Sequence, residues 1–367
     1  MKYARPEIND PTIKTKKITL SFGGAEVIVP SFETPIPIRE NFFRAARREN
    51  PMWVPYPASD IQSLHINELA TPQNGMQQGP DFINMSAVDY TFLDPFGNSW
   101  TWVTEAGGAM LTPHTKILED ICDWEKVIKF PNFNDWDFRE RAEKYMKERY
   151  DPDMVMHINI HQGLTEMLVA FLGGYEEGMT ALAIEPEACK DFFARFAKYM
   201  TDFFDMLDAL YPIDFITYHD DWGTERDTFF SSKMMEELVY EPTKTIVDHI
   251  RGRGKVFELH SCGKIERFLP YMCDLNIDLL QIQRRANDMP MLKQKYGDRI
   301  GFNVGIEGLD FNTPPSKEEL CQLIRNTIDI YGAGGGVYPS TYAVNPDDVW
   351  TIASEFYFYS REFYENK

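Results

Sequence analysis

From about residue 153 onward, the chain alternates short apolar runs with longer amphipathic stretches, and this alternation limits the folds open to it more than any other feature. The run "MVMHINI" (154–160) has the character of a strand, and residues 186–211 carry apolar side chains at helical spacing. Strands that alternate with helices pair in parallel, because each helix returns the chain to the same end of the sheet. The later strand-like runs are "IDFITYHDD", "KVFELHSC", "IDLLQIQ", "IGFNVGIE" and "GVYPSTY". This α/β pattern predicts a (β/α)8 TIM barrel, with an open, doubly wound sheet as the alternative.

The first 150 residues do not show this alternation of strand-like and helix-like segments. They are rich in proline, tryptophan and glycine, as in "NPMWVPYPAS" and "DPFGNSWTWVTEAGGAM", which is typical of β-ribbons and loops. We therefore predict an N-terminal β-ribbon and loop elaboration in residues 1–150, with room there for the first barrel elements, and the remainder of the barrel in residues 151–367. No clear linker separates the two parts, and 367 residues fit a single globular unit.

Charge and cysteine content narrow the range of functions. The net charge of −20 excludes nucleic acid as a partner, because phosphate binding depends on lysine and arginine. No apolar run approaches the length of a membrane-spanning helix, so we expect no membrane association. The five cysteines are scattered and odd in number, which indicates free thiols and predicts a cytoplasmic protein.

Polar side chains follow the predicted strands at the end where a barrel holds its active site. His161 directly follows the first run, and His219 and Asp221 lie at the end of the second, in "YHDDWG". A carboxylate and imidazoles can donate and accept protons, so we predict catalytic roles for Asp221, His219 and His161. Asp220 takes the opposite face of its strand, and we expect it to hold the backbone or cap a helix. The predicted substrate-binding residues are Trp222, Gln283, Asn303, Glu307, Tyr338 and Tyr342.

The stretch "FELHSCGKIE" (257–266) places a histidine and a cysteine two positions apart near a strand end. Alternate side chains of a strand share one face, so His260 and Cys262 can bind one cation, and mixed nitrogen and sulfur ligands favour zinc. Glu258 shares this face, but ligands at i, i+2 and i+4 span roughly 13 Å, which is too far for one ion. The alternative is a metal-free pocket wall with a hydrogen-bonded histidine.

Taken together, these motifs resemble the uroporphyrinogen decarboxylase superfamily. The resemblance runs through "NFFRAARRENPMWVP", "DPFGNSWTWVTEAGGAML", "YHDDWG", "LHSCGKIERFLP" and "GGGVYP". Within the superfamily, the blocks around "FGNSW" and "HDDWG" are similar to methyltransferases of corrinoid-dependent O-demethylation systems. The resemblance implies a (β/α)8 barrel, a homodimer, and an enzyme that moves a methyl group from a methylated small molecule to the Co(I) of a separate corrinoid protein. The high aromatic share of 14% favours a methoxylated aromatic as that donor.

The resemblance also implies zinc, with one departure from the pattern. In the methylcobamide:thiol branch, zinc is held by a His-x-Cys pair and a later cysteine. His260 and Cys262 match the pair, but "GGGVYPSTY", where the later ligand falls, contains no cysteine. The third ligand is then Asp221, Glu225 or His219, or the site holds no zinc.

Two other functions stay open at this point. One is a decarboxylase, for which the resemblance implies arginines that bind the substrate carboxylates. No arginine follows Trp53 in "PMWVPYPASD", and the negative charge of the chain opposes such a substrate. The other is a non-catalytic scaffold that binds the corrinoid protein.

Overall fold

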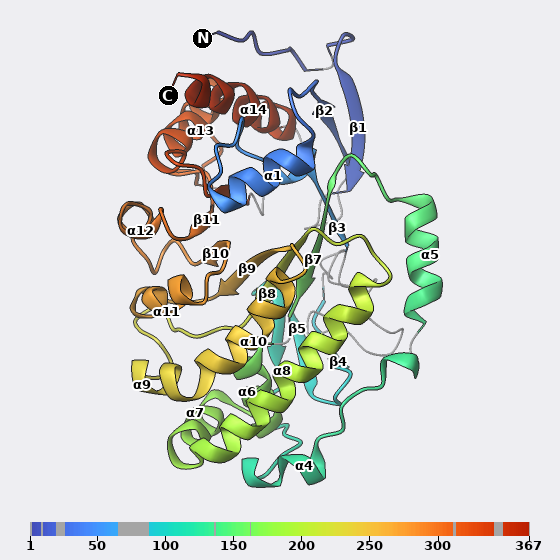
Figure 1. Cartoon of the computed structure of the whole chain (residues 1–367), viewed down its shortest axis with the longest axis vertical. Helices are drawn as coiled ribbons and strands as arrows, with labels where there is room; N and C mark the ends of the chain where they lie inside the picture. Colours follow the sequence, from blue (N-terminus) through green and yellow to red (C-terminus); the bar gives the residue numbers. More distant parts are fainter. Residues whose placement is uncertain are drawn as a thin grey trace. The chain divides into compact units, whose positions relative to one another are not determined.

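The structure is a computed structural model that describes residues 2–8, 10–19, 26–64, 88–135, 137–161, 163–310, 313–340 and 348–366 (Figure 1). It divides into two compact units. The first comprises Met1–Ser63, Asp151–Met156 and Asp278–Lys367, and the second comprises Leu64–Tyr150 and His157–Ile277. The boundary predicted at residue 150 and the single globular unit stay predictions.

Three parallel strands pair in the second unit: β7 (Val155–Ile160), which enters this unit at His157, β8 (Phe215–His219) and β9 (Val256–Ser261). The register pairs His157 with Phe215 and His219 with His260. Every residue of these strands is buried or half-buried, as is typical of parallel strands covered on both faces. Their carboxyl ends therefore meet at one edge of the sheet.

Helices fill the connections between these strands. The aromatic stripe predicted from helical spacing lies on α8 (Pro186–Asp208), where Phe192, Phe196 and Phe203 are buried in the core. Pro186 opens this helix, because its fixed φ suits the first turn. The other α-helices described in this unit are α4 (Trp124–Val127), α5 (Phe138–Glu148), α6 (Leu164–Leu172), α7 (Tyr175–Ile184), α9 (Ser232–Met234), α10 (Tyr240–Arg251) and α11 (Leu269–Asp274). Short 3-10 helices are η2 (Ile121–Asp123), η3 (Phe133–Asp135) and η5 (Glu266–Phe268), and η4 (Met235–Val239) is a π-helix.

Antiparallel strands occupy much of the N-terminal region, as predicted. In the second unit β4 (Tyr90–Leu93), β5 (Ser99–Val103) and β6 (Gly108–Leu111) form a three-stranded sheet. In the first unit β1 (Lys14–Thr19) pairs with β2 (Glu26–Ser31). These antiparallel strands agree with the β-ribbons predicted for residues 1–150, while their role as an elaboration of the barrel stays a prediction.

The first unit also has a parallel sheet. Its paired strands are β10 (Leu279–Ile282), β11 (Gly301–Val304) and β12 (Val337–Pro339). The short strand β3 (Ile61–Leu64) begins in this unit. The helices described here are α1 (Ile38–Arg47), α2 (Pro57–Asp60), α12 (Met289–Tyr296), α13 (Lys317–Tyr331) and α14 (Val349–Glu365). Parallel strands with helical connections in both units confirm the α/β class, while the closed barrel of eight strands stays a prediction.

Among the described residues, no single helix is long and apolar enough to cross a membrane, although α6 and α7 together pass that test as a pair bent by 108°.

Candidate active site

Three imidazole rings lie side by side at the ends of β7, β8 and β9. His161 follows β7, while His219 and His260 are paired in β8 and β9. The ring centroids of His161 and His219 are 3.7 Å apart, and those of His219 and His260 are 4.2 Å apart. Nε2 of His219 lies 3.1 Å from Oδ1 of Asn159, which fixes the middle ring. We call these three stacked rings the histidine row.

Two rings of the histidine row are neutral at physiological pH. Burial, with a smaller effect of His260, lowers the pKa of His161 to about 3. Burial and the neighbouring histidines lower the pKa of His219 well below its usual range. Proton donation from an imidazolium at either position is therefore unfavourable. As neutral rings they can act by stacking and hydrogen bonding, and their catalytic roles stay predictions.

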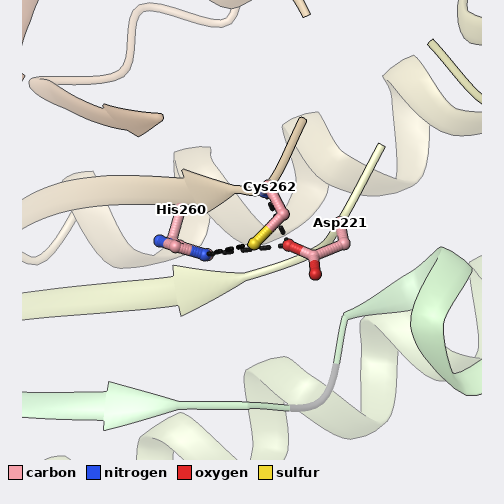
Figure 2. A group of neighbouring side chains, drawn as sticks. All are labelled: Asp221, His260 and Cys262. Atoms are coloured by element: carbon pink, nitrogen blue, oxygen red, sulfur yellow. Dashed lines mark hydrogen bonds and ion pairs between the residues drawn. The ribbon is translucent and has the colours of Figure 1, made fainter. Parts of the chain in front are cut away.

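Asp221, His260 and Cys262 bring three metal-ligand side chains together where β8 and β9 end (Figure 2). Nε2 of His260 is 3.5 Å from Sγ of Cys262 and 3.7 Å from Oδ1 of Asp221. One ligand atom from each residue lies within 4.8 Å of the others, and all three side chains are half-buried. This ligand cluster joins the predicted His-x-Cys pair to one of the three predicted third ligands.

The ligand cluster fits a catalytic zinc ion. Zinc–ligand bonds of about 2.0–2.3 Å at tetrahedral angles separate ligand atoms by roughly 3.4–3.6 Å. The separations of 3.5 and 3.7 Å found here agree with that spacing. Imidazole, thiolate and carboxylate are all zinc ligands, and the sulfur disfavours magnesium or calcium. Three protein ligands leave a fourth position for substrate, as catalytic zinc requires.

Backbone hydrogen bonds hold the ligand cluster in place. The N–H of Cys262 donates to Oδ1 of Asp221 at 2.7 Å, so the carboxylate bridges the two strand ends. The N–H of Trp222 donates to Oγ of Ser261 at 2.9 Å. Hydrogen bonds of this kind orient metal ligands and restrict their motion.

The loops that follow β8 and β9 are locked together by two glycines. Gly263 has a φ of +83°, and a Cβ added there would overlap the backbone of Gly223. The N–H of Lys264 donates to the carbonyl oxygen of Thr224 at 2.6 Å. Only glycine permits both this backbone conformation and this approach. The glycine contact therefore sets the separation between the loops that carry Asp221 and Cys262.

Asp220 is completely buried and lies outside the ligand cluster. Its Oδ1 accepts hydrogen bonds from the N–H groups of Thr165 and Glu166, at 3.0 and 3.1 Å, and from the Thr165 hydroxyl at 2.5 Å. These N–H groups lie in the first turn of α6, where no intrahelical acceptor is available. Asp220 thus caps α6, in agreement with the structural role expected from the sequence.

Replacing Asp220 by asparagine is expected to flatten the pH dependence of stability. Burial raises the pKa of Asp220 to about 6, above the unfolded value of about 3.9. Between these values the folded state binds more protons than the unfolded state, so stability from this group is present at low pH. The contribution of Asp220 to the unfolding free energy falls by at most about 3 kcal/mol as the pH rises to 6. Urea unfolding of both proteins at about pH 4 and pH 6.5 measures the effect. The same change in unfolding free energy in both would contradict the prediction.

Two further predicted site residues lie in the loop after β8. Trp222 is completely buried, and its indole packs edge-on against Phe268 with a centroid separation of 6.1 Å. Contact with a substrate would require this side chain to move. Glu225 is exposed and is not part of the ligand cluster, so among the described residues Asp221 is the better third ligand.

The remaining predicted substrate residues belong to the first unit. Asn303 of β11 is paired with Tyr338 of β12, and both are buried. Glu307 accepts a hydrogen bond of 2.8 Å from the hydroxyl of Tyr331. Gln283 is exposed after β10, and Tyr342 lies outside the described residues. The substrate-binding roles of these residues stay predictions.

A polar layer below the histidine row was not predicted from the sequence. Nε2 of His157 lies 2.9 Å from Oγ1 of Thr217, which donates to Oε1 of Glu258 at 2.8 Å. Asn159, Thr217 and Glu258 are aligned across the three strands. Alternation had already placed Glu258 on the face of His260 and Cys262, and the same alternation followed into β7 and β8 would have added Asn159 and Thr217.

Two aromatic residues beside the site were also missed. Tyr175 begins α7, and Phe229 lies in the loop after β8, where their rings stack with a centroid separation of 4.6 Å. Neither residue ends a strand, and no motif marks either of them. Only the folded arrangement places them together.

Comparison with known families defines the class of protein. The family model "Uroporphyrinogen decarboxylase (URO-D)" matches residues 164–348, which include the ligand cluster. This chain belongs to the uroporphyrinogen decarboxylase family. No curated protein matches it significantly.

Solved structures give a fold for comparison. A methyltransferase from Methanosarcina mazei is 14% identical, with a TM-score of 0.53 over 90% of this chain and 99% of that chain. The two proteins therefore share a fold. An endo-1,4-beta-xylanase from Caldicellulosiruptor owensensis is 10% identical over 60% of this chain and 75% of that chain, and its TM-score of 0.27 is too low to compare the folds.

Proposed function

We propose that this protein is a methyltransferase that moves a methyl group from a methoxylated aromatic compound to the Co(I) of a corrinoid protein. The observation that carries the proposal is the ligand cluster, a three-ligand donor set of the catalytic zinc type at the strand ends. The methyltransferase with the same fold supports the reaction class. The high aromatic content supports an aromatic donor.

The reaction breaks the bond between the methyl carbon and the ether oxygen. The methyl group bonds to cobalt, which supplies both electrons, and the oxygen leaves as a phenolate that is protonated by solvent. This oxygen is a poor leaving group, so its developing charge must be stabilised. Zinc held by Asp221, His260 and Cys262 would supply a Lewis acid at that oxygen.

The side chains of the site hold the ligand cluster rigid during this reaction. Asp221 is oriented by the N–H of Cys262. The ring of His260 stacks on His219, which is fixed in turn by Asn159. Rigid positioning of this kind lowers the reorganisation that the reaction requires.

Other features of the proposal concern partners and location. The corrinoid is carried by the partner protein and is the methyl acceptor. The superfamily resemblance supports a homodimer, and free cysteines among the described residues support a cytoplasmic location.

One assay and one analysis test the proposal. The purified protein is mixed with a reduced corrinoid protein and a panel of methoxyarenes, and methylcobalamin absorbance is followed. We expect methylation with at least one donor and about one zinc ion per chain by elemental analysis. A lack of methylation with every donor would contradict the reaction, and a lack of stoichiometric zinc would contradict the metal assignment.

Decarboxylation of a porphyrinogen is the second candidate, because the family model carries that description. The segment around Trp53 argues against it. The indole N–H of Trp53 donates to the buried carboxyl group of Asp60, whose pKa is raised by burial, so the side chain bound to this tryptophan is an acid and not a cation. A substrate with several carboxylates requires cations instead. Porphyrinogen turnover without methyl transfer would favour this second candidate, and binding of the corrinoid protein without any turnover would favour a scaffold.

A further inference from the structure

Tyr175 and Phe229 form an aromatic pair in the second unit. Their rings are stacked at 4.6 Å with an interplanar angle of 24°. Tyr175 is 46% exposed although its ring stacks on Phe229. The pair therefore presents open aromatic surface.

A backbone hydrogen bond ties Phe229 to the loop that carries Asp221. The N–H of Phe229 donates to the carbonyl oxygen of Trp222 at 2.8 Å, and Trp222 directly follows Asp221. The hairpin that returns the loop to this point is closed by a bridge between Gly223 and Thr228. Phe229 is thus anchored one residue away from a member of the ligand cluster.

Tyr175 meets Phe229 from the first residue of α7. The turn between α6 and α7 contains Gly173 with a φ of +90°, and it directs the chain so that α7 begins at Tyr175. Burial of the hydroxyl raises the pKa of Tyr175, and the negative charges of Glu166, Asp221 and Cys262 raise it further. The phenol end therefore lies within electrostatic reach of the ligand cluster and stays protonated.

We propose that Tyr175 and Phe229 form the wall of the substrate site that selects methyl donors with a planar ring. The inference rests on the proposed function for the identity of the reacting group. A planar ring stacks on an open aromatic face, whereas a puckered saturated ring makes fewer contacts with it. The protonated hydroxyl of Tyr175 can donate a hydrogen bond to a polar substituent on that ring.

Direct binding tests the wall without requiring turnover. The probes are 2-methoxyphenol and trans-2-methoxycyclohexanol, which carry the same substituents on a planar and on a saturated ring. Isothermal titration calorimetry of the purified protein, with no corrinoid present, is expected to show about fivefold tighter binding of the planar probe, the size of one aromatic contact. In Tyr175→Leu this preference should fall below about twofold.

Two further variants serve as controls for Tyr175→Leu. Tyr240→Leu removes a half-buried tyrosine that packs edge-on with Tyr271 elsewhere in the same unit, and it should keep the preference. Phe229→Leu should lose the preference as Tyr175→Leu does, and it decides the result if circular dichroism shows that Tyr175→Leu is unfolded. Failure of the unsubstituted protein to prefer the planar probe, including failure to bind either probe, would overturn the inference. So would a preference that survives the substitutions.

The outcomes also separate this inference from the proposed function. A preference that depends on Tyr175 supports the wall even if no methyl transfer is observed. Methyl transfer with an unchanged preference in Tyr175→Leu would overturn the wall alone. If Tyr175→Leu raised the KM for the corrinoid protein and kept the preference for the planar probe, Tyr175 and Phe229 would belong to the surface that binds the corrinoid protein. This result would also overturn the inference.

Discussion

His260→Ala is expected to lose bound zinc and methyl transfer together. His260 supplies the only nitrogen in the ligand cluster, and its Nε2 is within 3.7 Å of both other ligand atoms. Two remaining ligands are too few for a catalytic zinc site. Because a bound metal contributes several kcal/mol to stabilisation of developing charge, the rate should fall by about 10³-fold or more. Elemental analysis and the methylcobalamin assay on the same preparation measure both effects.

His249→Ala is the matched control for this substitution. His249 lies on α10, where its Nε2 contacts Oδ1 of Asp205 at 2.8 Å, and it has no place in the ligand cluster. Its replacement should leave zinc content and methyl transfer unchanged. Full activity in His260→Ala, or activity loss with zinc retained, would show that the histidine acts in another way.

Gly263→Ala should destabilise the protein and weaken zinc binding. The φ of +83° costs a residue with a Cβ about 1–2 kcal/mol, and overlap with the backbone of Gly223 adds about 1–3 kcal/mol. Relief of the overlap moves the loop that carries Cys262 away from the loop that carries Asp221. Denaturant unfolding and competition with a zinc chelator measure the two effects.

Gly254→Ala separates conformational strain from overlap. Gly254 has a φ of +79°, and a Cβ there meets nothing within 4 Å. Gly254→Ala should therefore lower the unfolding free energy only by the cost of the positive φ, and it should leave zinc affinity unchanged. If both variants lost the same stability and the same zinc affinity, the glycine contact would have no special role in the site.

The α/β class was predictable because parallel strands and their helices leave strong periodic patterns. The stripe of α8 is an example, since Phe192, Phe196 and Phe203 recur at helical spacing and are all buried. The division into two units was not predictable, because each unit combines segments that are far apart in the chain. Local patterns do not record which distant segments pack together.

The candidate site was predicted in part, and the limit has a physical basis. His260 lies in β9 and Cys262 directly follows its last residue, so alternation alone joined them. The choice of Asp221 over Glu225 or His219 required the register of β8 against β9 and the hydrogen bond from Cys262. Tyr175 could not be predicted as a site residue, because its position depends on the angle between α6 and α7 and not on any strand.

The order of the ligands along the chain has a consequence for biosynthesis. Asp221 and Cys262 are separated by only 41 positions, and the strands that carry them pair directly. Both are synthesised before residues 278–367, and segments that are near in the chain close loops at a lower entropic cost than distant ones. A metal ion bound at this stage stabilises the pairing of β8 and β9. Metal binding at the ligand cluster can therefore stabilise β8 and β9 as a folding nucleus, on which the later strands assemble.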